Sequence, residues 1–116
     1  FGLVGHLDEM LRAGAVGADL ELAAIPFLQG AEDLAAAGIA SSLAPANRSA
    51  LVGRITAVAD ARAALLFDPQ TSGGLLATVP PDRAEEALRR LKDTGYHAVA
   101  IGVIRAADQE PALRVR

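Results

Sequence analysis

A chain of 116 residues has the size of one ordinary domain, and its 52% of hydrophobic residues excludes an intrinsically disordered chain. The net charge of −3, the scattered Lys and Arg residues and an aromatic content of only 3% argue against nucleic acid as a partner. The absence of cysteine excludes disulfides, thiolate metal sites and cysteine nucleophiles from this segment.

The first half of the chain predicts a helix, a strand, a second helix and then a long loop. Apolar residues recur at helical spacing over residues 3–14, which end on a glycine. Residues 19–22 alternate polar and apolar, which predicts a strand with one face in water. Residues 30–37 are alanine-rich and predict a short helix, whereas the Ser, Pro, Asn and Gly residues of 39–53 predict mostly loop.

The second half adds three or four strands. Residues 55–58 predict a short strand, and residues 60–66 predict one or two helical turns. After a glycine-rich loop, residues 75–79 predict a strand that two prolines end. Residues 99–104 are a nearly continuous β-branched and apolar run, which is typical of a central strand, and residues 113–116 alternate as in an edge strand.

The strongest helix signal begins at Pro81. Glu85–Arg89 and Glu86–Arg90 are i,i+4 pairs of the favourable polarity, each worth about 0.2–0.5 kcal/mol. Small and apolar residues at helical spacing predict a buried stripe made of Ala84, Ala87, Leu88 and Leu91. This helix is therefore expected to pack on the sheet.

The order of these elements predicts an α/β fold, more closely an α+β sandwich, in which helices pack on a mixed β-sheet. We expect residues 1–116 to be a single domain without internal repeats. Because the chain opens on Phe1 and enters a helical pattern at once, we expect it to be part of a longer protein. No apolar run has the length of a bilayer and no signal-peptide pattern is present, so we expect a cytoplasmic protein without a membrane partner.

The glycine-rich loop at residues 68–74, with the sequence DPQTSGG, is the one stretch whose residues suggest a role other than packing in the core. Successive backbone N–H groups in such a loop can form an anion-binding concavity. The candidate phosphate- or substrate-binding residues are Asp68, Gln70, Thr71, Ser72, Gly73 and Gly74. Asp68 has three possible roles: to hold a metal, to orient the loop or to cap the turn. A plain turn that Asp-Pro opens and Gly-Gly closes explains the same residues, and without a lysine this is not a Walker-type motif.

Gly5 and His6 are further candidates for phosphate or substrate binding. His6 lies near a helix start, where anions are favoured, and Gly5 permits close approach of the backbone. The alternative for His6 is a polar residue at a domain junction. Asp8 and Glu9 are assigned to a solvated helix face and His97 to an exposed position, so we expect neither a catalytic residue nor a metal site in this segment.

Two strings carry a family resemblance: FGLVGHL at residues 1–7 and LFDPQTSGGLL at residues 66–76. The second resembles a signature of selenophosphate synthetase (selenide, water dikinase), and the first resembles the start of the C-terminal domain in that family. They occur in the expected order, so the resemblance covers essentially the whole chain. It implies the fold of the C-terminal domain of the aminoimidazole ribonucleotide synthetase superfamily, within a longer two-domain enzyme.

The resemblance also implies an activity for the full-length protein. That enzyme would convert selenide, ATP and water, with Mg²⁺, into selenophosphate, AMP and phosphate, and would act as a homodimer. Its N-terminal domain, outside this chain, would supply the catalytic Cys or selenocysteine, a nearby lysine and most metal-binding aspartates. The present domain would close over that site, would bind no ATP or Mg²⁺ alone and would be inactive alone.

The chain departs from the family pattern in two places. The acidic metal-binding segment that precedes Phe-Gly in the family is not present, and the loop at residues 43–49 lacks the family's Gly-Gly-Thr character, although Asn47 matches. Two alternatives stay open. One is a non-catalytic protein-interaction module that retains the fold; the other is a related ATP-dependent synthetase domain, against which the DPQTSGG string argues.

Overall fold

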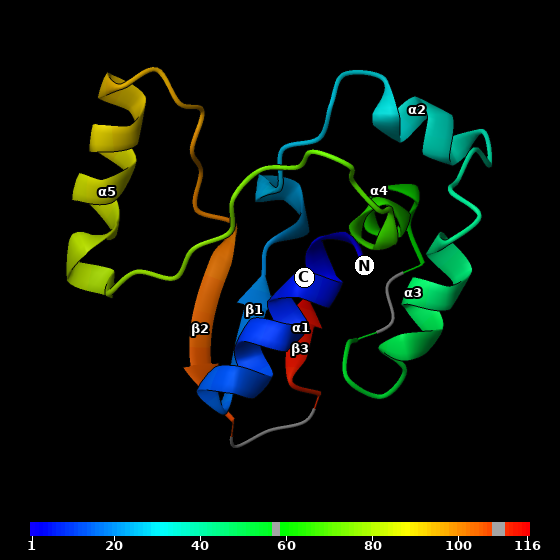
Figure 1. The fold of residues 1–116 in the computed structure, drawn as a ribbon, viewed down its shortest axis with the longest axis horizontal. Helices are drawn as coiled ribbons and strands as arrows, with labels where there is room; N and C mark the ends of the chain where they lie inside the picture. The colour runs from blue at the N-terminus through cyan, green and yellow to red at the C-terminus, as the bar shows by residue number, and fades with distance from the viewer. Residues whose placement is uncertain (57–58, 108–110) are drawn as a thin grey trace.

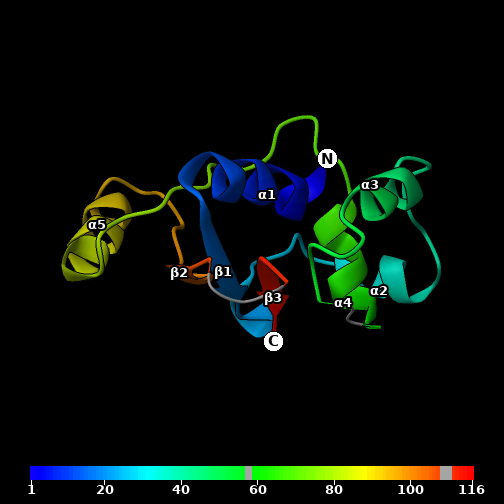
Figure 2. The ribbon, with the colours of Figure 1, turned by 90° about the horizontal axis from the view of Figure 1, so that it is seen from below.

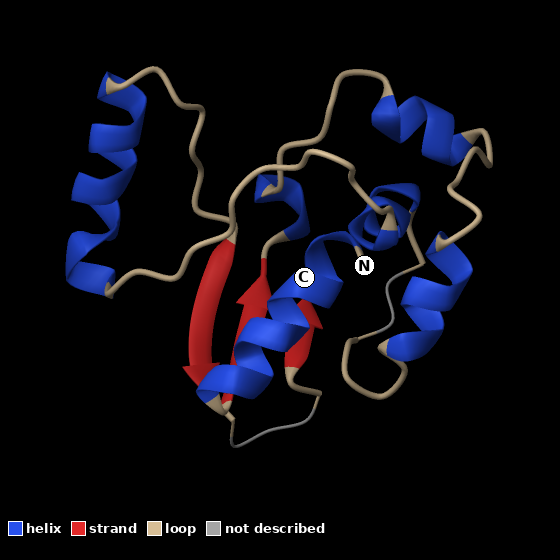
Figure 3. Ribbon diagram, viewed as in Figure 1, coloured by secondary structure: helices blue, strands red, loops and turns tan. Residues whose placement is uncertain are grey.

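The computed structural model describes residues 1–56, 59–107 and 111–116, and it has helices beside a small mixed sheet (Figures 1 and 3). In chain order the elements are α1 (Gly2–Gly14), β1 (Val16–Leu20), the 3₁₀ turn η1 (Leu22–Ala24), α2 (Ala31–Ala36), α3 (Ala44–Ala50), α4 (Ala61–Ala64), the 3₁₀ turn η2 (Leu65–Phe67), α5 (Pro81–Asp93), β2 (Gly102–Ala106) and β3 (Leu113–Val115). The predicted α+β class is confirmed.

The sheet has the order β2-β1-β3. β1 is antiparallel to β2, from Val16 opposite Ala106 to Leu20 opposite Gly102, and it is parallel to β3. Figure 2 shows α1 lying over one face of this sheet. The sheet therefore supports α1, whose first two turns carry the candidate residues Gly5 and His6.

The core lies between α1, the sheet and the α4–η2 segment. The buried apolar residues are Val4, Leu7, Leu11, Ala18, Leu20, Leu22, Ile25, Leu51, Ala63, Leu66, Phe67, Leu113 and Val115. The 3.6-residue period of α1 places its apolar side chains on one face, and that face is buried. At the end of α1, Ala15 adopts a left-handed conformation and its N–H contacts the carbonyls of Leu11 and Arg12.

Several predicted elements are confirmed. α1 ends at Gly14, and α2 falls inside the alanine-rich stretch, with Gly38 at a φ of +83° just beyond it. α4 and η2 occupy the predicted helical turns, and the Asp60 carboxylate caps α4 by accepting from the Arg62 N–H at 2.6 Å. β3 is an edge strand, as its alternation indicates.

Two strand predictions shift. β1 lies at Val16–Leu20 rather than at residues 19–22. Leu22 is buried as predicted, but it belongs to the 3₁₀ turn η1 and not to the strand. In the short strand predicted at residues 55–58, Ile55 forms an isolated parallel bridge with Leu113. Residues 57–58 lie outside the described residues.

The prediction of a loop over residues 39–53 is wrong for its centre, because α3 forms at Ala44–Ala50. Pro45 lies in the first turn of α3, where its missing N–H needs no partner and its fixed φ suits a helix. Residues that commonly form loops can therefore also begin a helix, and the prediction from composition missed α3 for this reason.

Two predictions about the sheet are wrong. Residues 75–79 form no strand, and Leu75 is fully exposed. β2 is an edge strand with mostly exposed residues, and β1 is the central strand. A β-branched run favours extended backbone, but the order of strands depends on which segments pair across the sheet.

α5 has the predicted start and stops before Gly95, which has a φ of +88°. Its predicted buried stripe is wrong: no residue of α5 is buried and Leu91 is 42% exposed. Figure 1 shows α5 set apart from α1 and the other helices, beyond β2. An apolar stripe is buried only where another surface covers it. Among the described residues, no helix is both long and apolar enough to cross a membrane.

The two ion pairs predicted along α5 have different outcomes. Arg90 pairs with Glu86 at 2.7 Å, as predicted. Arg89 instead contacts Asp93 at 2.9 Å, one turn further along the helix. Both pairs are exposed, so each contributes little to stability.

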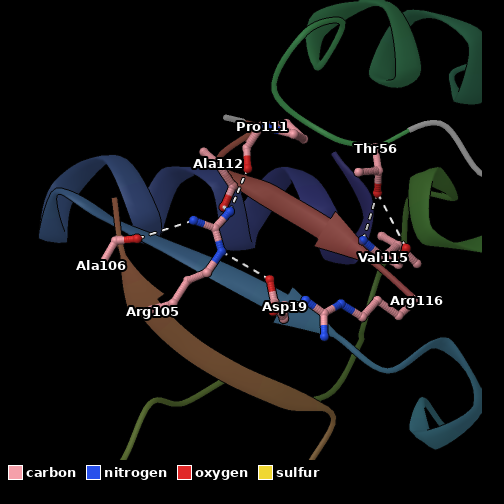
Figure 4. A network of polar contacts seen from close by, with 8 residues as sticks. All are labelled: Asp19, Thr56, Arg105, Ala106, Pro111, Ala112, Val115 and Arg116. Carbon is pink, nitrogen blue, oxygen red and sulfur yellow. Dashed lines mark hydrogen bonds and ion pairs between the residues drawn. The ribbon is translucent and has the colours of Figure 1, made fainter. Parts of the chain in front are cut away.

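A polar network joins the three strands (Figure 4). Asp19 on β1 accepts from Arg105 Nε of β2 at 3.0 Å and pairs with Arg116 at 2.8 Å. The Thr56 hydroxyl accepts from the backbone N–H of Val115 at 2.8 Å. Side-chain contacts therefore reinforce the backbone hydrogen bonds that join both edge strands to β1, and they also connect β3 to Thr56.

Arg62 on α4 holds the segment around η1 against the helices. Its Nε donates to the Leu22 carbonyl at 2.9 Å, its Nη2 donates to the Ile25 carbonyl at 2.6 Å, and its guanidinium lies 4.8 Å from the ring centre of Phe27. It also pairs with Glu32. A guanidinium can make these contacts together because its donors form a planar fork.

Arg62→Lys is therefore expected to lower the free energy of unfolding by about 1–2 kcal/mol, because a single ammonium cannot reach both carbonyls. Urea denaturation measures the loss. The matched control is Arg83→Lys on α5, an exposed position where the change should stay within about 0.5 kcal/mol. Equal stabilities for the two variants would contradict this role of Arg62.

Candidate functional site

The glycine-rich loop leaves the core directly after η2. Leu66 and Phe67 are buried, Asp68 and Pro69 are half-buried, and residues 70–74 are exposed. Figure 2 shows the chain after α4 and η2 rising beside the N-terminal end of α1. The loop therefore reaches solvent next to the start of α1.

The two strings singled out in the sequence meet at Gly2. Gly2 has a φ of +73°, and a Cβ placed there would lie 2.5 Å from the Leu66 carbonyl oxygen and 2.7 Å from the Phe67 carbonyl carbon. Only glycine permits both this backbone conformation and this approach. The first residue of α1 thus packs directly on the backbone that leads into the glycine-rich loop.

The main-chain donors of the loop are available. In the described part of the chain, no hydrogen bond is donated by the backbone N–H groups of residues 70–74, and these residues are exposed. By contrast, the Asp68 N–H donates to the Leu65 carbonyl at 3.1 Å. Exposed, adjacent N–H groups can bind an anion, and they are equally compatible with a solvated turn.

Asp68 has one described side-chain contact, because Gln70 Nε2 donates to its Oδ2 at 3.1 Å. This contact orients the first half of the loop. Within residues 1–56, 59–107 and 111–116, no three His, Asp or Glu side chains cluster closely enough to hold a metal ion. Asp68 would therefore contribute at most one of several ligands in a metal site.

Gly73 and Gly74 differ in how closely they are packed. A Cβ on Gly74 would meet no atom within 4 Å, and a Cβ on Gly73 would lie 3.3 Å from Gln70 Cβ. Neither has a positive φ. The protein itself thus leaves room beside Gly74, whereas Gly73 is in close contact with the Gln70 side chain.

Gly5 and His6 have local contacts. The His6 ring lies edge-on to Phe1 with ring centres 6.2 Å apart, and its Nδ1 is 3.7 Å from the Glu9 carboxylate. A Cβ on Gly5 would collide with the Phe1 side chain, so this glycine makes room for Phe1. The described contacts of both residues lie within the first turns of α1 and do not involve residues 68–74.

Asp8 does not belong to a solvated helix face, and that assignment is wrong. Asp8 is only 4% exposed, and it accepts from Arg12 Nε at 2.7 Å and from Arg54 Nε at 2.6 Å. Arg54 comes from a distant part of the chain, which is why the local pattern did not reveal the contact. Glu9 and His97 are exposed, as predicted.

Sequence reasoning did not find two residues of α3 that contact the start of the loop. Asn47 Nδ2 donates to the Phe67 carbonyl at 2.9 Å, and the Arg48 guanidinium lies 4.6 Å from the Phe67 ring centre. The one signal for Asn47 was its match to the family pattern in a stretch that otherwise predicted a loop. No signal pointed to Arg48.

The fold agrees with the family comparison. Residues 1–113 match the family described as AIR synthase related protein, C-terminal domain. The chain belongs to this family.

The relatives carry a more particular name. The chain is 42% identical to the selenide, water dikinase of Geobacter metallireducens, over 88% of this chain and 30% of that protein. It is 38% identical to the enzyme of that name from Caldanaerobacter subterraneus, over 90% and 31%, and 35% identical to that of Geobacter sp. strain M21, over 99% and 34%. The chain thus spans about a third of the length of these relatives. The predicted resemblance to the C-terminal domain of selenide, water dikinases is confirmed.

Proposed function

We propose that this chain is the C-terminal domain of a selenophosphate synthetase and closes over an ATP-dependent site whose catalytic residues lie in an N-terminal domain. The observation that carries the proposal is the exposed run of residues 70–74 beside the start of α1, whose N–H groups donate no hydrogen bond to any described residue. The relatives' names support the activity. The glycine-rich loop would bind a phosphate group or the selenide nucleophile.

The chemistry expected of the loop is electrostatic. Adjacent N–H dipoles in a turn create a positive concavity without any cationic side chain. The hydroxyls of Thr71 and Ser72 add donors at the same place, and Gly74 leaves space for close approach. Donors aimed at a developing negative charge typically contribute about 100- to 1000-fold in rate for each donor.

The full reaction would use selenide, ATP and water and release selenophosphate, AMP and phosphate. ATP with Mg²⁺ would supply the activated phosphoryl group, and both would be held mainly by the N-terminal domain of a homodimer. The residues of the present chain would orient an anion and exclude water by closing. This chain alone is expected to turn over no ATP.

The test uses the intact protein with Ser72→Pro or Gly74→Val. Ser72→Pro removes one backbone donor, and Gly74→Val fills space that the protein itself leaves open. We expect selenophosphate formation, followed by phosphorus NMR, to fall by at least about 100-fold in each variant. The melting temperature should stay close to that of the wild type, because neither residue packs against the core.

Ala77→Val is the matched control, since it adds the same kind of side chain at an exposed position just outside the loop. It should keep full turnover. Undiminished selenophosphate formation in both loop variants would refute the anion-binding role. An intact wild-type protein that makes no selenophosphate would refute the proposed function itself.

A protein-binding module is the second candidate, and a separate observation favours it. Large apolar side chains are exposed on β2, on α5 and on the segments that precede and follow α5: Leu75, Val79, Leu91, Val99, Val103 and Ile104. Exposed apolar groups gathered in one region often mark a contact surface. A further domain of a longer protein would cover the same groups, so selenophosphate formation by the intact protein decides between the candidates.

A further inference from the structure

We propose that Asn47 and Arg48 are positioning residues that fix the base of the glycine-rich loop, an inference that rests on the proposed role of that loop. Phe67 is the last residue before the loop and is 5% exposed. The Asn47 amide donates to its carbonyl at 2.9 Å, and the Arg48 guanidinium covers its ring at 4.6 Å. Adjacent residues of α3 thus hold both the backbone and the side chain of Phe67.

The Phe67 carbonyl needs a partner because η2 ends at this residue. The last carbonyls of a helical turn have no N–H donor inside the helix, and a half-buried carbonyl is costly to leave unpaired. The Asn47 side chain supplies the donor from a segment 20 residues earlier. Asn47 therefore both satisfies this carbonyl and sets its direction.

Gly2 contacts the same part of the chain. Its Cα lies so close to the Leu66 and Phe67 backbone that no side chain fits between them. Phe67 is therefore in contact with both the first residue of α1 and the middle of α3. A shift of either helix would move the origin of the loop.

The orientation of Phe67 is passed on to the loop through a stiff connection. Asp68 is extended, with φ −75° and ψ 123°, as the residue before a proline is required to be. Pro69 has a fixed φ of its own. The backbone is thus restricted at two successive residues between the Phe67 carbonyl and the loop, so the direction in which the loop starts depends on how Phe67 is held.

Asn47→Leu in the intact protein tests the proposal, since leucine is similar in size and has no donor. We expect kcat for selenophosphate formation to fall about 10- to 100-fold, the loss typical of a displaced reacting geometry, with a smaller change in KM for ATP. Hydrogen exchange at the Asp68 N–H, which bonds to Leu65, should be faster than in the wild type. Asn47→Gln retains an amide donor and should recover part of both properties.

Ser49→Ala is the control, because Ser49 is exposed on the same helix and has no side-chain contact among the described residues. It should leave kcat and exchange unchanged. Wild-type kcat and exchange in Asn47→Leu would overturn the inference. The inference would also be overturned if Asn47→Leu lost activity only in proportion to its loss of folded protein and Asn47→Gln recovered none of it. If the wild type makes no selenophosphate, the proposed function fails, and exchange at Asp68 still decides whether Asn47 holds the loop.

Discussion

Replacing Gly2 with alanine is expected to lower the free energy of unfolding by about 2–5 kcal/mol. The left-handed backbone of this residue, with φ at +73°, costs about 1–2 kcal/mol for any residue with a Cβ. The added Cβ would also lie 2.5 Å from the Leu66 carbonyl oxygen, and relieving such overpacking typically costs about 1–3 kcal/mol. Urea denaturation of the intact protein measures the sum.

Gly38→Ala separates the two contributions. Gly38 has a similar φ of +83°, but a Cβ there would meet no atom within 4 Å. Its loss of stability should therefore be limited to the backbone term of about 1–2 kcal/mol. If the two alanine variants lose the same stability, the close contact between α1 and the base of the glycine-rich loop does not contribute.

Asp8→Asn is expected to lower the free energy of unfolding by about 2–3 kcal/mol. Asp8 accepts from Arg12 and Arg54, and breaking a fully buried ion pair typically costs about 3–5 kcal/mol. The cost should be lower here, because the side chains of Arg12 and Arg54 are 57% and 31% exposed and can be hydrated when the carboxylate is removed. Thermal and urea unfolding both measure this loss.

Glu9→Gln is the neighbouring control. Glu9 is 69% exposed and lies 3.7 Å from His6, so the loss of its charge should change stability by no more than about 0.5 kcal/mol. A comparable loss at both positions would mean that general helix electrostatics, and not the contact with Arg54, accounts for the effect of Asp8.

Helices were predictable from sequence wherever their signals are local. The apolar period of α1, the alanine content of α2 and the proline at the start of α5 all act within one or two turns. A glycine also ends α1, and glycines closely follow α2 and α5. The prediction failed at α3, where Pro45, Asn47 and Ser49 are loop formers by composition. Asn47 uses its side chain in a distant contact, which composition does not reveal.

The candidate site was predictable in part for the same reason. The loop at residues 68–74 has an unusual run of turn residues and a family signature, so it could be found from the letters alone. Gly5 and His6 were chosen from their place near a helix start, but their described contacts stay within α1. Asn47 and Arg48 were missed because they contact the loop's base from a separate helix.

The sequence by itself determined the family, the helix periods and the presence of a glycine-rich loop, because these depend on neighbouring residues. Only the tertiary structure decided that β1 is the central strand, that Asp8 is buried against Arg54 and that Gly2 and Asn47 meet at Phe67. Each of these contacts joins segments far apart in the chain. Their formation depends on how the whole chain packs, which no local pattern encodes.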